Sequence, residues 1–232
     1  MSAVAAEGVW KYFGDYPALA NINLQVEPGA CLALLGRNGA GKTTLLRILG
    51  GLSRPSRGRV LVFGDEVRNR RSRCRIGVLG HGIGVYEEFS ALENLRLFAG
   101  LYGLAEPESA ARRWLERTGL ERAGSSPVRE FSRGMRQRLA VARAFIHDPE
   151  LLLLDEPFTA LDDRAIAFLQ QLLAETRARG RTVILSTHQL REALELATHA
   201  AVIERGRLVF AGERTGQMLS DPGWLYRTYG EG

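Results

Sequence analysis

Apolar and polar residues alternate early in the chain, where Ile22, Leu24 and Val26 occupy every second position. A period of two is typical of a strand that buries one face. The apolar run CLALLG, residues 31–36, follows a Pro-Gly turn and predicts a second, fully buried strand. Residues 43–49 then predict a helix and residues 59–63 a further strand, followed by a loop rich in arginine and glycine.

After residue 89 the apolar spacing becomes helical. Ser90 and Glu93 form a capping box at the start of a first helix, whose apolar residues are Leu92, Leu95, Phe98 and Leu101. Pro107 is placed to open a second helix and Gly119 to close it. The octet FSRGMRQR, residues 131–138, begins a third helix that stops at Asp148-Pro149. One face of this third helix carries Met135, Leu139, Ala142 and Ile146.

From residue 149 the pattern again favours strands alternating with helices. Residues 151–154 are four leucines, as expected for a strand of a parallel sheet that is covered on both faces. A helix, a buried strand at 182–186 and a short helix follow, and residues 200–203 and 208–210 flank Arg205-Gly206 as a hairpin. We therefore expect one domain, residues 1–232, in which an α/β core (1–87 and 149–232) carries an inserted helical lobe (88–148).

Composition narrows the class of protein. Hydrophobic residues make up 45% and charged residues 25% of the 232 residues, which is ordinary for a globular protein. No apolar run approaches the ~20 residues that span a bilayer, and the N-terminus lacks the pattern of a secretory signal. Two cysteines, Cys31 and Cys74, cannot form a disulfide framework. These features predict a cytosolic location.

A net charge of +5 and a pI near 9.6 invite a nucleic-acid-binding interpretation. The basic residues, however, are 29 arginines and two lysines scattered along the chain, so we expect no nucleic-acid partner. One cluster, residues 68–75, fits a solvated loop, with a specific anionic partner as the alternative. Lys42 is an exception to the arginine preference, and it lies within GRNGAGKTT. A narrow ammonium reaches between phosphates where a planar guanidinium does not fit.

The segment around Lys42 fits the phosphate-loop pattern G-x-x-x-x-G-K-[ST] in full, between a predicted strand and a predicted helix. Its glycines let backbone N–H groups converge on phosphate oxygens. Lys42 is expected to contact the β- and γ-phosphates of ATP, and the Thr43 hydroxyl to ligate Mg²⁺. The predicted ATP-binding set is Gly36, Arg37, Asn38, Gly39, Ala40, Gly41, Lys42, Thr43 and Thr44.

Two adjacent acids follow the four leucines of residues 151–154. Asp155 ends the predicted strand and is expected to hold the metal, whereas Glu156 points to a different side. Two carboxylates at a dry strand end are costly unless a cation or a proton transfer uses them. A carboxylate beside the γ-phosphate can polarise an attacking water as a general base, which is the role expected of Glu156.

The octet FSRGMRQR contains a second candidate anion receptor. Ser132 occupies the position of a helix cap, and Gly134 frees backbone N–H groups at the positive end of the helix. Taken alone, plain capping is the commoner explanation. With the phosphate loop and the acid pair, however, the octet resembles the LSGGQ-like signature of the ATP-binding cassette (ABC) ATPases. Ser132, Gly134 and Gln137 match that signature, while Phe131, Arg133 and Met135 are substitutions.

This resemblance implies roles for further residues. Two chains of the family pack head to tail, so that the signature of one closes over the ATP held by the other, which predicts a homodimer or a pair with a related subunit. Phe13 resembles the residue that stacks on adenine, with Tyr12 and Tyr16 as alternatives. His188 resembles the switch histidine that contacts the γ-phosphate. The loop that contacts the other subunit corresponds to Ala160, Leu161 and Asp162.

One position departs from the family pattern. His81 stands where a glutamine usually leads into the helical lobe and touches Mg²⁺ and the attacking water. Imidazole is a less natural partner for Mg²⁺ than an oxygen ligand, which puts a metal contact at His81 in doubt.

The resemblance implies a P-loop NTPase (RecA-like) core with an N-terminal antiparallel β subdomain and an inserted α-helical subdomain. It also implies separate integral membrane permease subunits and a position on the cytoplasmic face of the cell membrane. Residues 80–103, with LLLLDEPFTALD and STHQ, look most like the ATPase subunit of the haem exporter of cytochrome c maturation. ATPases of drug, polysaccharide and lipid exporters remain alternatives, as does a soluble ABC ATPase of translation or DNA repair. A P-loop kinase or GTPase would leave the signature, Glu156 and His188 unexplained.

Overall fold

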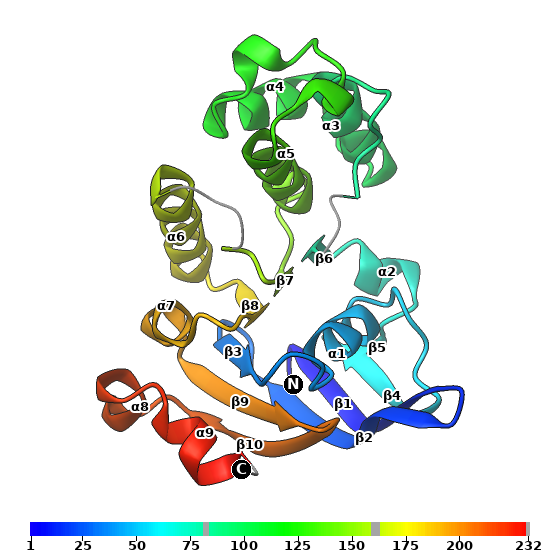
Figure 1. The fold of residues 1–232 in the computed structure, drawn as a ribbon. Coiled ribbons are helices and arrows are strands. Elements are labelled where there is room, and N and C mark those ends of the chain that lie inside the picture. The colour runs from blue at the N-terminus through cyan, green and yellow to red at the C-terminus, as the bar shows by residue number, and fades with distance from the viewer. Residues whose placement is uncertain (81–83, 159–162, 231–232) are drawn as a thin grey trace.

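Two β-sheets lie side by side in the computed structural model, which describes residues 1–80, 84–158 and 163–230 (Figure 1). The N-terminal sheet is antiparallel, with strand order β2-β1-β4-β5. Its strands are β1 (Val4–Phe13), β2 (Tyr16–Val26), β4 (Arg57–Val62) and β5 (Asp65–Glu66). It corresponds to the antiparallel subdomain implied by the resemblance.

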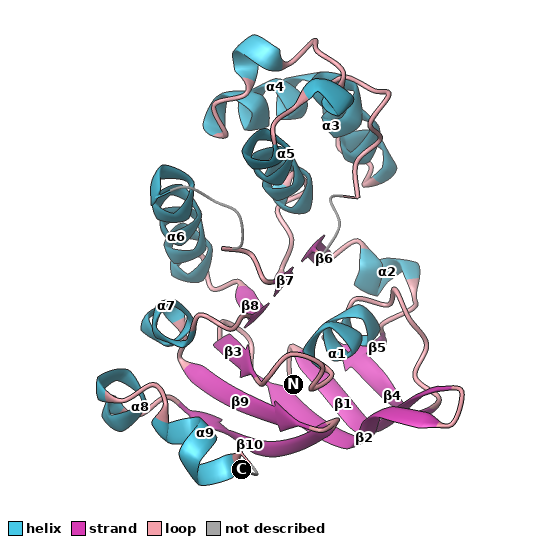
Figure 2. Cartoon of the chain, in the orientation of Figure 1, coloured by secondary structure: helices cyan, strands magenta, loops and turns pink. Residues whose placement is uncertain are grey.

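The second sheet has the order β10-β9-β3-β8-β7-β6, and all its strands are parallel except the edge strand β10. The strands are β3 (Cys31–Leu35), β6 (Ile76–Leu79), β7 (Leu151–Asp155), β8 (Thr182–Ser186), β9 (His199–Glu204) and β10 (Arg207–Glu213). Helices α1 (Lys42–Leu49), α6 (Asp163–Ala178) and α7 (Leu190–Leu196) flank this sheet (Figure 2).

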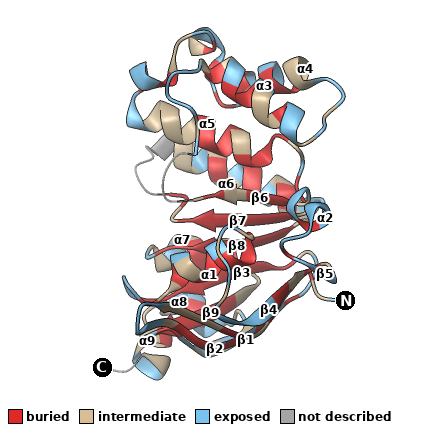
Figure 3. Cartoon of the chain, turned by 90° about the vertical axis from the view of Figure 1, so that its right-hand side faces the viewer, coloured by how far each residue is buried: buried red, intermediate tan, exposed pale blue. Residues whose placement is uncertain are grey.

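The central strands of the parallel sheet feed two hydrophobic cores at once. In β7, Leu151 and Leu153 join the core that contains α1 and the antiparallel sheet. Leu152 and Leu154 join the core on the opposite face, with residues of α6 and α7. This is why the four leucines form a strand without polar alternation, and why β3, β7 and β8 are buried along their whole length (Figure 3).

Helices α3 (Ala91–Leu101), α4 (Pro107–Arg117) and α5 (Arg133–Phe145) form a separate lobe between β6 and β7 in sequence. They share a third core that includes Leu95, Leu115 and Leu139. The capping box of Ser90 and Glu93 is present, and Ser132 caps α5 as expected. The prediction that Leu101 belongs to the apolar face of α3 is wrong, because this residue is 65% exposed.

Residues near the C-terminal end of α5 attach this lobe to the sheet. The Arg143 guanidinium donates from Nη2 to the Val78 carbonyl (2.6 Å) and from Nη1 to the Gly84 carbonyl (3.1 Å). His147 stacks on Tyr102 with ring centroids 3.5 Å apart, and its Nε2 contacts the Ile76 carbonyl (3.2 Å). Burial lowers the pKa of His147 to about 4, so the ring is neutral near pH 7.

The region predicted as an arginine-rich loop is more ordered than expected. Residues Arg70–Arg73 form a short helix, α2. Arg75 pairs with Glu150 (2.7 Å) and lies over the Phe63 ring at 3.9 Å from its centroid. The prediction of a solvated loop is therefore wrong for Arg75, since both an acid and an aromatic ring hold its side chain.

The C-terminal part forms two short helices, α8 (Gly216–Ser220) and α9 (Trp224–Tyr229), which the periodicity did not predict. They pack on the sheet through Met218 and Leu225, which are both buried. In the part of the chain that the structure describes, no helix combines the length and apolar character needed to cross a bilayer.

Candidate functional site

The phosphate loop connects β3 to α1, as its sequence context predicts. Its glycines adopt φ angles of 155° at Gly36, 81° at Gly39 and 111° at Gly41. A Cβ on Gly36 would lie 2.4 Å from the Ile203 carbonyl oxygen, and one on Gly41 would lie 2.8 Å from the Ala18 carbonyl oxygen. Glycine is therefore required at both positions by backbone conformation and by the close approach of neighbouring strands.

Lys42 begins α1 and is 7% exposed. Its Nζ donates to the carbonyl oxygens of Gly36 (2.7 Å) and Arg37 (3.2 Å). Burial lowers the pKa of this ammonium, and the negative charges of Glu156 and Asp155 oppose that effect. The pKa of Lys42 therefore depends on the two neighbouring carboxylates as well as on burial in the loop.

A turn from the far end of the sheet holds the phosphate loop in place. Gly206, between β9 and β10, donates its N–H to the Ala40 carbonyl (2.9 Å) and accepts from the Ala20 N–H (2.8 Å). Gly206 has a φ of 76°, and a Cβ there would lie 2.7 Å from the Ala18 carbonyl oxygen. One glycine therefore joins the loop to β2 of the antiparallel sheet.

The same strand β2 leads to the candidate adenine-binding aromatics. Phe13 and Tyr16 pair across the β1–β2 hairpin, and they are 58% and 63% exposed. The ammonium of Lys11 lies 5.3 Å from the centroid of the Phe13 ring. Tyr12 instead stacks on Trp10, with ring centroids 5.9 Å apart. Phe13 and Tyr16 consequently stay the better candidates of the three.

Asp155 lies at the end of β7, opposite the start of α1, and is 6% exposed. Its Oδ1 accepts hydrogen bonds from the Thr43 hydroxyl (3.1 Å) and from the Ser186 hydroxyl. A carboxylate and a hydroxyl side by side fit Mg²⁺, which takes oxygen ligands and commonly uses one or two carboxylates together with substrate phosphates. No group of three or more His, Cys, Asp or Glu side chains within the described residues forms a metal site without substrate.

Glu156 and His188, both predicted as catalytic, are in direct contact. The Glu156 Oε2 lies 2.8 Å from the His188 Nδ1 and accepts from the His188 N–H at 3.3 Å. Glu156 has a φ of 51°, and its N–H donates to the Ser186 carbonyl (2.9 Å). Its side chain is 14% exposed, against 59% for that of His188. The carboxylate is therefore oriented by a histidine that itself reaches the surface.

The signature residues lie at the start of α5. The Ser132 hydroxyl accepts from the Met135 N–H (3.2 Å), which is an N-cap, and Ser132 and Arg133 are exposed. Among the described residues, nothing lies within 4 Å of the position that a Cβ on Gly134 would take. Buried Phe131 anchors the segment in the core of the lobe. The first residues of α5 are thus accessible on the lobe, while α1 packs in the core that it shares with the antiparallel sheet (Figure 1).

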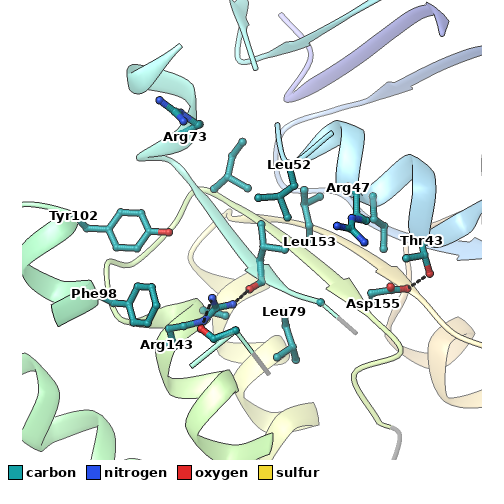
Figure 4. Close-up of a pocket in the computed structure, with 17 residues that line it drawn as sticks. Thr43, Arg47, Leu52, Arg73, Leu79, Phe98, Tyr102, Arg143, Leu153 and Asp155 are labelled. Atoms are coloured by element: carbon teal, nitrogen blue, oxygen red, sulfur yellow. Dashed lines mark hydrogen bonds between the residues drawn. The ribbon is translucent and has the colours of Figure 1, made fainter. Parts of the chain in front are cut away.

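A cavity of about 550 Å³ opens between α1, β6 and the lobe. Figure 4 shows it extending from Thr43 and Asp155 to Phe98 and Tyr102, with the Arg143 guanidinium between lobe and strand. Leu52, which is 61% exposed, also lines it. Sequence patterns did not predict this cavity, because its lining residues come from six separate elements.

Several predicted residues lie outside the described part of the chain. These are His81, for the metal, and Ala160, Leu161 and Asp162, for the contact with a second subunit. Conversely, sequence reasoning missed Ser186, Gly206 and Tyr226, which all bond to the predicted site. Only the Arg205-Gly206 turn signal hinted at one of them.

Comparisons with known proteins agree with this geometry. A sequence profile described as ABC transporter matches residues 19–159. The chain is 42% identical over 209 residues to Nod factor export ATP-binding protein I of Cupriavidus metallidurans, covering 88% of this chain and 69% of that protein. It is 41% identical over 215 residues to daunorubicin resistance ATP-binding protein DrrA3 of Streptomyces coeruleorubidus, covering 91% and 68%.

Solved structures are similar as well. One, described as the ATP-binding subunit of an ABC transporter, has a TM-score of 0.86 and 31% identity, covering 99% of this chain and 95% of its own. Another is the dimeric post-hydrolysis state of the ATP-binding cassette MJ0796 bound to ADP and phosphate. It has a TM-score of 0.84 and 28% identity, and the match covers 92% of this chain and 99% of that chain.

We expect the substitution Gly206→Ala to weaken both the fold and ATP binding. The positive φ alone costs a residue with a Cβ about 1–2 kcal/mol, and the clash with the Ala18 carbonyl adds to this. The expected result is a lower melting temperature together with a higher Kd for ATP, measured by calorimetry. Gly216→Ala is the matched control, because a Cβ there, at the start of α8, has no neighbour within 4 Å in the part of the chain that the structure describes. Equal effects of the two substitutions would contradict the bracing role of Gly206.

Proposed function

The chain belongs to the ABC transporter family, and on that premise we propose that it is the ATP-hydrolysing subunit of an exporter whose membrane domains are separate polypeptides. The observation that carries this proposal is the cluster of Lys42, Asp155, Glu156 and His188 around the phosphate loop. A buried cation, a carboxylate bonded to the loop threonine and a second, oriented carboxylate are the parts that phosphoryl transfer to water requires.

ATP binds with its phosphates on the backbone N–H groups of residues 36–43 and on the Lys42 ammonium. The ammonium lies against two carbonyl oxygens of the same loop, so a short rotation of the side chain exchanges these acceptors for phosphate oxygens. Phe13, or Tyr16 opposite it, stacks on the adenine ring. Both aromatic rings are exposed on a hairpin whose second strand runs to the phosphate loop.

Thr43 and Asp155 are the residues that would hold Mg²⁺, the latter directly or through water. The ion would supply charge neutralisation on the phosphates of ATP. The Ser186 hydroxyl, which donates to the same carboxylate oxygen as Thr43, keeps Asp155 oriented toward α1.

Glu156 takes the proton of the attacking water. Its carboxylate is 14% exposed and is held by the side chain and backbone of His188, so it does not rotate away from the phosphate loop. Contact through Nδ1 leaves the other ring nitrogen of His188 to stabilise the charge that develops on the γ-phosphate. Pairing between these two residues makes the histidine a support for the base as well as a contact for the nucleotide.

The signature completes the site from a second chain. Ser132 and Gly134 lie at the positive end of α5, where Ser132 is exposed and Gly134 half-buried. An arrangement of two chains head to tail brings that helix end to the γ-phosphate on the partner. Charge-assisted hydrogen bonds of this kind are stronger than neutral ones, so ATP holds the dimer closed and its hydrolysis lets the dimer open.

Export of an organic molecule is the transport reaction that we favour. The two relatives described above are named for Nod factor export and for daunorubicin resistance. Neither name supports the more specific resemblance to a haem exporter, which stays a prediction. The same names argue against a soluble ATPase of translation or DNA repair.

The membrane partner docks at the cavity between α1 and the lobe. The cavity is bordered by Leu52 and Phe98 and reaches Thr43 and Asp155. Exposed Tyr86 and Phe89, in contact with each other at 5.3 Å, belong to the segment that leads from β6 into the lobe. A segment inserted between core and lobe senses their relative position, which is how nucleotide state reaches the membrane. With this contact, the proposed position of the protein is the cytoplasmic face of the membrane.

We expect Glu156→Gln to retain ATP binding while ATP hydrolysis falls by about 10²–10⁴-fold, the usual contribution of a general base. Steady-state phosphate release and calorimetric ATP titration measure the two effects. Glu195→Gln is the matched control, because Glu195 lies in α7 and pairs with exposed Arg191 on the surface. Hydrolysis by Glu156→Gln within a few-fold of wild type would show that the base is another group.

In the Glu156→Gln background we expect Mg-ATP to convert monomers into dimers, and Ser132→Arg to prevent this. The long side chain occupies the space in front of the α5 N-terminus. Light scattering after size exclusion measures the mass. Ser125→Arg, at an exposed serine in the same lobe, is the control and should leave the dimer intact.

Mixing a Lys42→Ala chain with a Ser132→Arg chain, both in that background, should restore some dimer, since one composite site is then complete. A mixture that stays monomeric while the parent protein dimerises contradicts the head-to-tail arrangement.

Leu52→Asp should leave the ATPase activity of the isolated protein within about twofold of wild type, because exposed substitutions away from special features cost little. It should, however, abolish co-purification with the membrane subunit. Leu101→Asp is the control, since Leu101 is equally exposed at 65% but does not line the cavity. Retention of the membrane subunit by the Leu52 variant would place the docking surface elsewhere.

A further inference from the structure

The first glycine of the phosphate loop is bonded to a residue far along the chain. Its N–H donates to the hydroxyl oxygen of Tyr226 at 2.9 Å, across 190 residues of sequence. Its carbonyl oxygen accepts from the Lys42 ammonium at 2.7 Å. Both backbone polar groups of Gly36 are therefore held by side chains, one from α1 and the other from α9.

Packing on the sheet determines where Tyr226 lies. The neighbouring Leu225 is fully buried in the core that contains Leu35 of β3. The Tyr229 ring packs at a tilt against Phe210 of β10, with centroids 4.7 Å apart, and edge-to-face against Trp224, with centroids 5.8 Å apart. These contacts hold α9 without involving the phosphate loop, so the hydroxyl is preorganised before any nucleotide arrives.

The surroundings of the hydroxyl keep it a neutral phenol. Burial raises the pKa of Tyr226, the Gly36 N–H and Arg37 lower it, and the negative charges of Glu204 and Glu156 raise it further. Glu204 is 8% exposed, and within the described residues its buried Oε2 has no hydrogen-bond partner. A protonated Tyr226 accepts from Gly36 without adding a second charge beside this carboxylate.

Gly36 has little freedom to respond if this bond is lost. The loop approaches β9 so closely that a Cβ on Gly36 would lie 2.4 Å from the Ile203 carbonyl oxygen. An unpaired N–H at this junction has to find water or pull the backbone away from β9. Either response moves the Gly36 carbonyl, and with it the acceptor that locates the Lys42 ammonium.

We propose that Tyr226 is a positioning residue of the nucleotide site, through which helix α9 sets the affinity of the phosphate loop for ATP. The inference rests on the proposed nucleotide site and adds to it a part of the chain that carries none of the family motifs. Tyr226 acts through Gly36 and Lys42 and has no contact with the reacting atoms. Its loss therefore raises the KM for ATP and leaves kcat almost unchanged.

The test is Tyr226→Phe, which removes the hydroxyl oxygen and keeps the ring. The matched control is Tyr229→Phe, since the Tyr229 ring packs in the same helix but its hydroxyl makes no hydrogen bond within the described residues. We expect the Tyr226 variant to bind ATP about tenfold more weakly, the effect of one lost hydrogen bond to a buried group. Its kcat should stay within about twofold of wild type, and its melting temperature should fall by only a few degrees relative to the control, because the lost bond also belongs to the nucleotide-free protein.

Hydrogen exchange distinguishes loss of the bond between Tyr226 and Gly36 from a general loosening of α9. The peptide containing Gly36 should exchange faster in Tyr226→Phe, while peptides from α8 and β10 should exchange as in the control. Equal ATP affinity of the Tyr226 and Tyr229 variants would overturn the inference, as would exchange that accelerates throughout α8, α9 and β10.

The substitution Lys42→Ala distinguishes a failure of the inference about Tyr226 from a failure of the proposed function. If Lys42→Ala abolishes ATP binding and Tyr226→Phe has no effect, the nucleotide site stands and the role of Tyr226 is wrong. If Lys42→Ala binds ATP as tightly as wild type, the phosphate loop is not the nucleotide site and both proposals fail.

Discussion

A positive charge that is removed from water must be surrounded by acceptors, and the Lys42 ammonium imposes this requirement on the whole site. It is 7% exposed, and it is held by the Gly36 and Arg37 carbonyl oxygens, with Asp155 and Glu156 close enough to oppose the effect of burial on its pKa. Carbonyl oxygens can converge in this way only if the loop follows an unusual backbone path. That path needs glycine at Gly36 and Gly41, and it needs neighbouring strands that hold it.

Strands and turns from both sheets hold the phosphate loop in this backbone path. The β9–β10 turn bonds to Ala40 through Gly206, and β2 bonds to the same turn through Ala20. Asp155 ends β7, and Glu156 follows it. Because the leucines of this strand are buried on both faces of the sheet, its polar side chains stand at its C-terminal end. With the bond from Tyr226 of α9 to Gly36, both sheets and the helix α9 therefore contact the phosphate loop or the turn that holds it.

Local patterns in the sequence predicted the position of the phosphate loop between a strand and a helix and the caps of two helices, whereas distant contacts could not be predicted. The phosphate loop, the Ser132 cap and the capping box of Ser90 involve residues within a few positions of each other, so their spacing carries the information. By contrast, strand β1 has irregular register with β2 between Ala6 and Val9, which breaks the alternation that identifies strands. The bonds of Gly36 to Tyr226 and of Ala40 to Gly206 join residues far apart along the chain, which no single-sequence periodicity reports. The same limit explains why the arginine-rich segment was predicted to be a solvated loop, although Arg75 contacts Phe63 and Glu150.

Arg143 has a mechanical consequence for the strand-to-lobe connection. Its guanidinium donates hydrogen bonds to the carbonyl oxygens of Val78 and Gly84, so one side chain of α5 holds the backbone at both positions. A tilt of α5 therefore moves the Val78 and Gly84 backbones together, because one side chain holds both. Rotation of the lobe then reaches β6, the edge strand of the parallel sheet, through the Val78 carbonyl.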